Sequence, residues 1–219
     1  HASLTLSDAT VRRAVEAERS FGVGFHLHVA ESDDEVRLAL KDHAVRVVER
    51  WAALGVLGPR TIAAHCLHID REEVALLKDS LTRVVHNPRS NMNNGVGAAD
   101  VPVMLRRGLP VGLGNDGFSQ NLWQELQIAF LLPRLVARDP RASDGPAYVD
   151  LLLRHNPQTA TAAFGLPLGR IAVGAAADLA LLRYHPPTPV SPQNLAWHRL
   201  VGRAGSPVDT TIGSGRVLM

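Results

Sequence analysis

The chain is poor in cysteine and has no long apolar stretch. Cys66 is the only cysteine among 219 residues, which excludes an intrachain disulfide and a zinc site built from several thiolates. No apolar run approaches the roughly 18 residues that a membrane-spanning helix needs. We therefore expect a cytoplasmic protein that has no membrane partner.

The chain also lacks a large excess of charge of one sign. The formal net charge is +2, and the arginines, although more numerous than the lysines, are scattered rather than clustered. This pattern does not favour a nucleic-acid partner. With 46% apolar and 20% charged residues, the chain has the composition of an ordinary globular protein. It begins with His1 rather than Met, so we expect it to be part of a longer polypeptide.

Short apolar runs alternate with amphipathic stretches over residues 1–165, which predicts strand–helix units around a parallel sheet, an α/β fold. Ser32 and Asp70 each precede a glutamate by three residues, the pattern of a helix-start capping box. The predicted strands are 24–30, 61–66, 83–86 and 110–115. The predicted helices lie between Ser32 and Gly55, after Asp70, and at 100–107, 121–137 and 146–163, with a polar loop at 89–99.

From about Leu166 the pattern changes. Short strands are predicted at 169–174, 178–182 and 208–218, with a proline-rich crossing at 186–192. We therefore divide the chain into residues 1–165 and a small β-rich segment, residues 166–219.

Each of the four predicted parallel strands ends in a residue that can bind a metal or move a proton. These residues are His28, His65, His86 and Asp116, and Glu31 follows His28 by three positions. In parallel barrels, functional residues gather at the C-terminal ends of the strands. Gly112 and Gly114 share a strand face with Asp116, and glycine at such positions leaves room for a ligand. The pattern predicts a functional site at this sheet edge.

Four motifs occur in order: His-Leu-His-Val-Ala-Glu (26–31), Ala-His-Cys-Leu-His (64–68), His-Asn-Pro-Arg-Ser-Asn (86–91) and Gly-Leu-Gly-Asn-Asp-Gly (112–117). Together they resemble the aminohydrolase branch of the amidohydrolase superfamily, which includes guanine, 8-oxoguanine and adenosine-type deaminases and triazine hydrolases. The resemblance implies a (β/α)8 TIM-type barrel with a β-sandwich. Residues 1–165 would be its C-terminal half, strands 5–8, and residues 166–219 part of the sandwich.

The resemblance also implies roles for individual residues. His28 would be a metal ligand, Glu31 a proton shuttle and His65 the histidine that assists the attacking water. Asp116 would be both a metal ligand and the general base. One divalent metal is implied, zinc in preference to iron. The family carries two further ligands in a His-x-His pair on barrel strand 1, and no motif in this sequence matches that pair.

The implied function is hydrolysis of a C–N bond in a cyclic amidine, as in a purine-type or triazine-like deaminase, with His86 and Asn91 contacting the small heterocyclic substrate. Amide or halide hydrolysis on a similar ring remains an alternative, because loop residues decide the substrate. A second hypothesis is that the chain is not an enzyme by itself but an inert half-barrel that needs its N-terminal half or self-association. Unpaired strand edges favour association, so we expect a homo-oligomer.

Each candidate also has an ordinary structural interpretation. His65 by itself is typical of a hydrogen-bonded core histidine, and Asp116 before Gly117 is typical of a turn. Cys66 alternates with His65 along its strand and is predicted to be a buried apolar residue. Four further histidines are predicted at the surface or in loops, namely His43, His155, His185 and His198.

Overall fold

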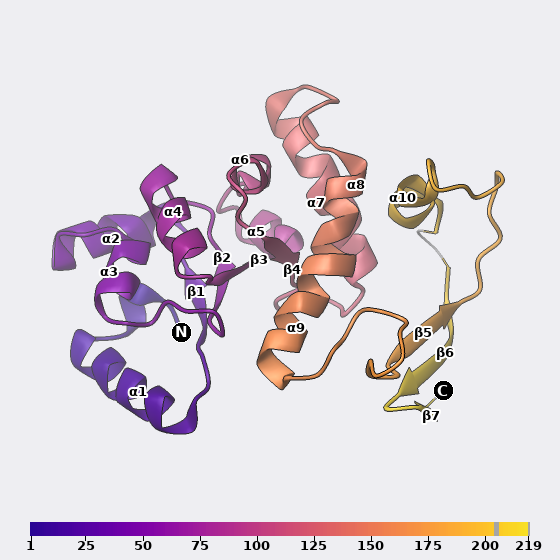
Figure 1. The fold of residues 1–219 in the computed structure, drawn as a ribbon. Coiled ribbons are helices and arrows are strands. Elements are labelled where there is room, and N and C mark those ends of the chain that lie inside the picture. Colours follow the sequence, from indigo (N-terminus) through magenta and orange to yellow (C-terminus); the bar gives the residue numbers. More distant parts are fainter. Residues whose placement is uncertain (204–205, 219) are drawn as a thin grey trace.

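The computed structural model describes residues 1–203 and 206–218, and it contains two separate sheets (Figure 1). Four parallel strands lie in the order β1-β2-β3-β4, and three antiparallel strands lie in the order β5-β6-β7. The bounds are β1 His26–Val29, β2 Ile62–His65, β3 Arg83–His86, β4 Val111–Leu113, β5 Leu179–Leu182, β6 Val208–Gly213 and β7 Arg216–Val217. The predicted α/β class and the four predicted parallel strands are confirmed.

Helices connect the parallel strands. Their bounds are α1 Asp8–Phe21, α2 Asp33–His43, α3 Val47–Ala53, α4 Arg71–Asp79, α5 Pro88–Asn94, α6 Val101–Arg106, α7 Leu122–Ala137, α8 Gly145–Asp150, α9 Asn156–Phe164 and α10 Leu195–Trp197, with a 3-10 turn at Ser3–Thr5 and π-helical turns at Leu151–His155 and His198–Gly202. Within residues 1–203 and 206–218, none of these helices has the length and apolar character needed to cross a membrane.

The two predicted capping boxes mark real helix starts. The Ser32 hydroxyl accepts a hydrogen bond from the Glu35 N–H, and the Asp70 carboxylate accepts one from the Glu73 N–H. The single helix predicted between Ser32 and Gly55 is wrong, however. Ala44 takes a left-handed backbone conformation with φ 60°, which ends α2, and the chain enters α3 a few residues later.

Three other predictions need correction. The predicted polar loop at 89–99 begins inside helix α5, where Pro88 in the first turn needs no N–H partner and Gly95, at φ 65°, ends the helix. The predicted helix at 146–163 is interrupted by a π-helical turn. The predicted strand at 169–174 does not form, and the predicted final strand is the hairpin of β6 and β7.

The two faces of the four-stranded sheet differ sharply. Its helix-covered face is buried and mostly apolar, and includes Leu27, Val29, Ala63, Val84, Val111 and Leu113. On the other face, His26 is exposed, whereas His28, Arg83 and Val85 are half-buried. Because side chains alternate along a strand, covering one face of the sheet with helices leaves this second face to form a site.

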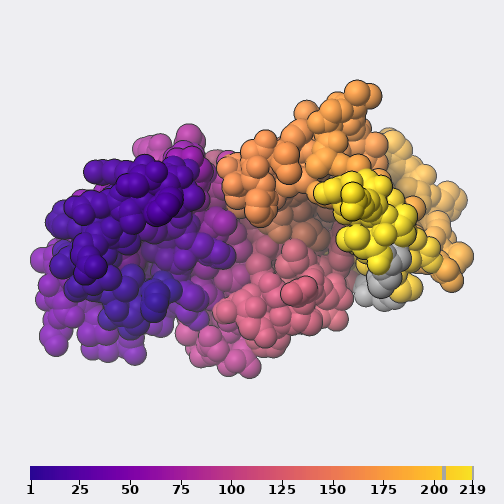
Figure 2. All heavy atoms as spheres, turned by 90° about the horizontal axis from the view of Figure 1, so that it is seen from below, coloured from indigo at the N-terminus to yellow at the C-terminus, as the bar shows by residue number. Residues whose placement is uncertain are grey.

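The antiparallel sheet lies in the segment predicted as a separate unit, residues 166–219, of which residues 204–205 and 219 lie outside the described chain. Figure 2 shows the N-terminal segments at one end of the molecule and the C-terminal strands toward the other. The boundary between residues 1–165 and 166–219 stays a prediction.

Candidate active site

Three predicted site residues meet at the C-terminal end of the parallel sheet. His28 lies in β1, Glu31 follows that strand, and His65 is the last residue of β2. One potential ligand atom from each of the three lies within 4.8 Å of the others. The imidazole rings of His28 and His65 stack, with their centroids 5.2 Å apart. The parallel register of β1 and β2 therefore produces a compact cluster of two imidazoles and a carboxylate.

Asp116 approaches the same cluster from the loop after β4. Its Oδ2 lies 3.8 Å from Nε2 of His65, and Glu31 Oε2 lies 3.7 Å from that nitrogen. Both His65, at φ 73°, and Asp116, at φ 49°, take left-handed backbone conformations. Such conformations cost non-glycine residues on the order of 1 kcal/mol or more, and they concentrate at functional sites. At both strand ends, the left-handed backbone conformation accompanies a side chain that is directed toward the other, His65 toward Asp116.

The hydrogen bond on the far side of the His65 ring sets the orientation of the ring. His65 Nδ1 lies 2.8 Å from Asn91 Oδ1. An amide oxygen only accepts, so Nδ1 donates this hydrogen bond and Nε2 faces the carboxylates of Glu31 and Asp116. Over the described parts of the chain, this buried Nε2 has no hydrogen-bond partner. Two carboxylates and two imidazoles around one point form an arrangement that a cation would satisfy.

The donor set fits a divalent metal. Imidazole nitrogen and carboxylate oxygen are the ligands that zinc and iron accept in hydrolytic sites. The predicted metal ligands were His28 and Asp116, whereas the tightest group of donor atoms consists of His28, Glu31 and His65. The division of these four side chains into metal ligands and proton-transfer groups is therefore a proposal, taken up below.

Sequence reasoning missed two residues that hold the site. The Ser90 hydroxyl donates a hydrogen bond to Asp116 Oδ2 at 2.5 Å, and Asn94 Nδ2 donates one to Glu31 Oε1 at 3.0 Å. Both belong to α5, which the sequence predicted as a loop. A loop has no preferred face, so no periodic signal marked these side chains.

The β4 glycines make room for neighbouring protein side chains. A Cβ on Gly114 would collide with the side chains of Asn87 and Val85, and one on Gly112 would collide with the Asn156 amide. Asn156 uses the room at Gly112 to bridge the edge of β4, accepting from the N–H of Leu113 and donating to its carbonyl. Gly114 also lines the cavity beside the candidate residues, and room for a ligand there stays a prediction.

The two predicted substrate contacts, His86 and Asn91, are both buried. Burial lowers the pKa of His86 to about 3, and the nearby His65 adds to the effect, so the ring is neutral at physiological pH. Asn91 lies behind His65 and holds its Nδ1 proton. Direct contact of either residue with a substrate stays a prediction.

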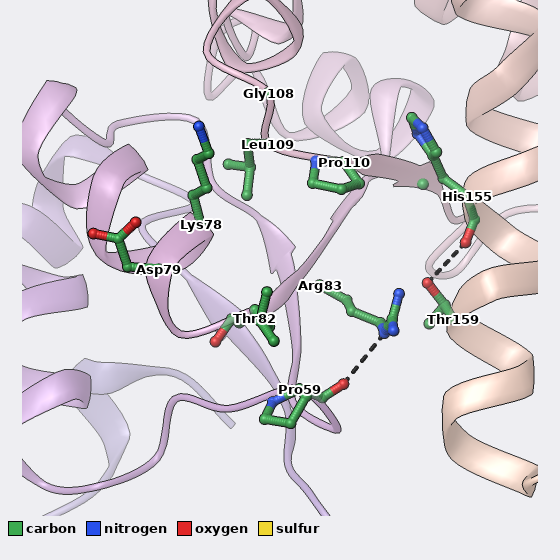
Figure 3. A pocket seen from close by; sticks show the side chains of 12 residues that line it. Pro59, Lys78, Asp79, Thr82, Arg83, Gly108, Leu109, Pro110, His155 and Thr159 are labelled. Atoms are coloured by element: carbon green, nitrogen blue, oxygen red, sulfur yellow. Dashed lines mark hydrogen bonds between the residues drawn. The ribbon is translucent and has the colours of Figure 1, made fainter.

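A cavity of about 400 Å³ lies against the candidate residues and is lined by His28, His65, Asn87, Gly114 and Asp116 among others. This volume suits a small heterocycle. A larger cavity of about 550 Å³ lies at the opposite end of the strands, where Arg83 donates to the Pro59 carbonyl and Thr159 to the His155 carbonyl (Figure 3). None of the candidate residues lines it, so we place the site in the smaller cavity.

Two histidines predicted at the surface or in loops are buried. His155 Nδ1 donates to the Val111 carbonyl at 2.8 Å, and His198 Nδ1 lies 2.5 Å from the Tyr184 hydroxyl. Because histidine is a hydrophilic residue type, the sequence did not indicate these buried hydrogen-bond partners. His185 is exposed, as predicted. Cys66 is completely buried, also as predicted, and burial raises the pKa of its thiol.

Residues 1–218 match the sequence profile described as the amidohydrolase family. The chain belongs to this family, and the predicted resemblance is confirmed.

Curated relatives of the chain include deaminases. The chain is 32% identical over 223 residues to the 5'-deoxyadenosine deaminase of Methanothermobacter thermautotrophicus, covering 100% of this chain and 51% of that protein. It is 31% identical over 223 residues to the 5-methylthioadenosine/S-adenosylhomocysteine deaminase of Moorella thermoacetica, covering 100% of this chain and 52% of that one. The chain thus spans about half the length of the curated relatives it matches.

The fold matches solved structures over the same extent. A zinc-bound adenosine deaminase from Xanthomonas campestris superimposes with a TM-score of 0.82 at 24% identity, covering 97% of this chain and 49% of the other. At this identity the likeness establishes the fold: a four-stranded parallel sheet with a small antiparallel sheet corresponds to about half of an amidohydrolase structure.

Proposed function

We propose that this chain forms part of a metal-dependent hydrolase that acts on a C–N bond of a cyclic amidine, in a purine-type or triazine-like ring, and releases ammonia. The observation that carries the proposal is the convergence of the Glu31 and Asp116 carboxylates on Nε2 of His65, a buried nitrogen that has no hydrogen-bond partner among the described residues. Family membership and the deaminase names of the relatives support the reaction class.

The fold assignment is part of the same proposal. Strands β1–β4 would be strands 5–8 of a (β/α)8 barrel, and residues 166–219 would contribute to its β-sandwich. The half-length coverage of relatives and the TM-score of 0.82 support this assignment.

In the proposed site, His28 and Asp116 would hold one divalent metal, zinc in the first place, and such a metal would supply a water activated for attack at neutral pH. His65 Nε2 orients the attacking water. Asp116 accepts a proton from the water as a C–O bond forms at the ring carbon, and Glu31, acting as the acid, delivers a proton to the ring nitrogen. Asp116 then passes its proton to the departing amino group, the C–N bond breaks and ammonia leaves. The new hydroxyl group gives its proton to Glu31 as the C=O bond forms, so both carboxyl groups return to their starting states.

Replacement of Asp116 tests the proposal. Ammonia release from adenosine, 5'-deoxyadenosine, guanine and 8-oxoguanine would be measured with zinc present. Asp116→Asn should lower kcat/KM by roughly 10³-fold, because it removes a base while preserving the shape of the side chain. The unfolding midpoint should change little. Retained activity within about threefold of wild type would remove Asp116 from the mechanism.

A second candidate is an inert half-barrel that becomes a hydrolase only with a partner. Within the described residues, β1 and β4 are the two edges of the parallel sheet, and the face bearing His26 and Arg83 is only partly covered. Exposed edges of this kind favour association. Light scattering and metal analysis distinguish the candidates: a monomer with zinc and turnover rejects the second, whereas an inactive, metal-free chain supports it.

A further inference from the structure

One short helix makes a hydrogen bond to each of three candidate catalytic residues. From α5, Ser90 donates to Asp116 Oδ2 at 2.5 Å and Asn94 donates to Glu31 Oε1 at 3.0 Å. Asn91, next to Ser90, accepts from His65 Nδ1 at 2.8 Å. The three partners come from three different strand ends, and α5 contacts all of them.

The spacing of the three helical residues explains how one element reaches three partners. Ser90 and Asn94 are four positions apart and therefore lie on the same side of the helix, with Asn91 beside them. Ser90 and Asn91 are buried against the site, whereas Met92 is 51% exposed on the other side. The helix thus turns one polar face toward the cluster.

Both ends of α5 are fixed to neighbouring elements. At its N-terminal end, Arg89 Nε pairs with the fully buried Glu125 of α7 at 2.6 Å, and the Arg89 backbone N–H donates to the same carboxylate. Just beyond its C-terminal end, the Val96 carbonyl accepts from His68 Nε2 at 2.9 Å, and His68 Nδ1 pairs with Asp33 at 2.7 Å. A helix held at both ends can fix the side chains that its polar face contacts.

We propose that α5 is the positioning element of the proposed hydrolytic site. Ser90 orients the Asp116 carboxylate, Asn91 fixes the His65 ring with its Nε2 toward the cavity, and Asn94 restrains Glu31. The inference rests on the proposed function for its metal-binding consequence, but the hydrogen bonds themselves do not depend on a metal. Groups that hydrogen bond to metal ligands in this way typically affect metal affinity by 10-fold to 100-fold.

Zinc affinity tests the role of Ser90. Competition with a chromophoric zinc chelator would compare wild type with Ser90→Ala, for which we expect roughly 10-fold to 100-fold weaker binding. Ser90→Thr keeps the hydroxyl donor and should recover most of the affinity. Met92→Ala, on the exposed side of the same helix, is the matched control and should bind zinc as wild type does. Wild-type zinc affinity in Ser90→Ala would overturn the role of Ser90.

Imidazole ¹⁵N NMR of the metal-free chain tests the role of Asn91 independently of zinc. In wild type, His65 should carry a hydrogen-bonded proton on Nδ1. Asn91→Leu should lose this preference for a proton on Nδ1, whereas Asn91→Asp, which keeps an acceptor oxygen, should retain it. An unchanged tautomer in Asn91→Leu would overturn the inference. If this variant does not fold, the Ser90 comparison still decides.

The two measurements separate the inference from the proposed function. A wild-type chain that binds no zinc, but whose His65 tautomer depends on Asn91, would reject the metal site and leave the positioning role of Asn91 intact. Zinc binding that is insensitive to Ser90, together with a tautomer insensitive to Asn91, would leave the metal site intact and reject the role of α5.

Discussion

Arg50 Nη1 donates hydrogen bonds to both the carbonyl oxygen and the hydroxyl of Ser3, at 2.6 and 2.7 Å, across 47 residues of sequence. Its other amino group donates to the Leu6 carbonyl and to Asp8. The Ser3 N–H in turn donates to Glu35, whose carboxylate also accepts the backbone N–H of Glu31. The buried guanidinium of Arg50 therefore holds the N-terminal segment at Ser3, and Ser3 in turn contacts Glu35 of α2, the helix that follows Glu31.

Loss of this guanidinium should destabilise the fold. Arg50→Met should lower the free energy of unfolding by about 3 kcal/mol, because it leaves the Ser3 and Leu6 carbonyls without their donor in a buried region. Urea unfolding measures the change. Arg37→Met is the control, since Arg37 pairs with Asp34 on the surface, and it should have little effect. A loss below about 1 kcal/mol in Arg50→Met would contradict the structural role of Arg50.

Acid should destabilise the chain through His86. Burial holds the pKa of this ring at about 3 in the folded state, against 6.5 for the unfolded chain. Below pH 6.5 the unfolded state binds a proton that the folded state does not, so stability falls as the pH falls. The loss is about 1.4 kcal/mol per pH unit, or about 2 kcal/mol between about pH 7.5 and pH 5.

Urea unfolding at these two pH values measures the effect, and His86→Gln should reduce the difference by about the same 2 kcal/mol. His185→Gln, which removes an exposed histidine, is the control. An identical pH dependence in wild type and His86→Gln would show that this ring does not become charged on unfolding.

Much of the sheet could be predicted because its signals are local. Leu27 and Val29 alternate with His26 and His28, and this period of two predicted both the strand and the face that the helices bury. The capping box at Ser32 is likewise a short-range hydrogen-bond pattern. Local patterns of this kind can be recognised without knowledge of the rest of the fold.

The arrangement around the site depends on long-range contacts and could not be predicted. Ser90 and Asp116 are 26 residues apart, and Asn94 and Glu31 are 63 residues apart. Nothing in the residues flanking Ser90 or Asn94 indicates these partners. The motifs identified candidate residues, but only the fold shows that Asn91 holds His65 and that Asn87 fills the space at Gly114.

Cys66 should be unreactive in the folded chain. Its side chain is completely buried, so a reagent cannot reach the sulfur. Burial also raises the pKa of the thiol, which disfavours the reactive thiolate. A chromogenic disulfide reagent should react with this one thiol only as fast as the chain unfolds, and stoichiometrically in urea. Fast reaction under native conditions would contradict the buried position of Cys66.

Zinc should stabilise the fold if the donor atoms of His28 and Asp116 are shared by one ion. A ligand that binds only the folded state at 100 times its dissociation constant raises the free energy of unfolding by about 2.7 kcal/mol. For a chain of this size the thermal midpoint should rise by roughly 5–10 °C. Asp116→Asn should lose most of this shift, and His185→Asn should keep it. Because the measurement requires no substrate, an equal zinc-induced shift in Asp116→Asn would exclude this carboxylate as a ligand, whatever the chain hydrolyses.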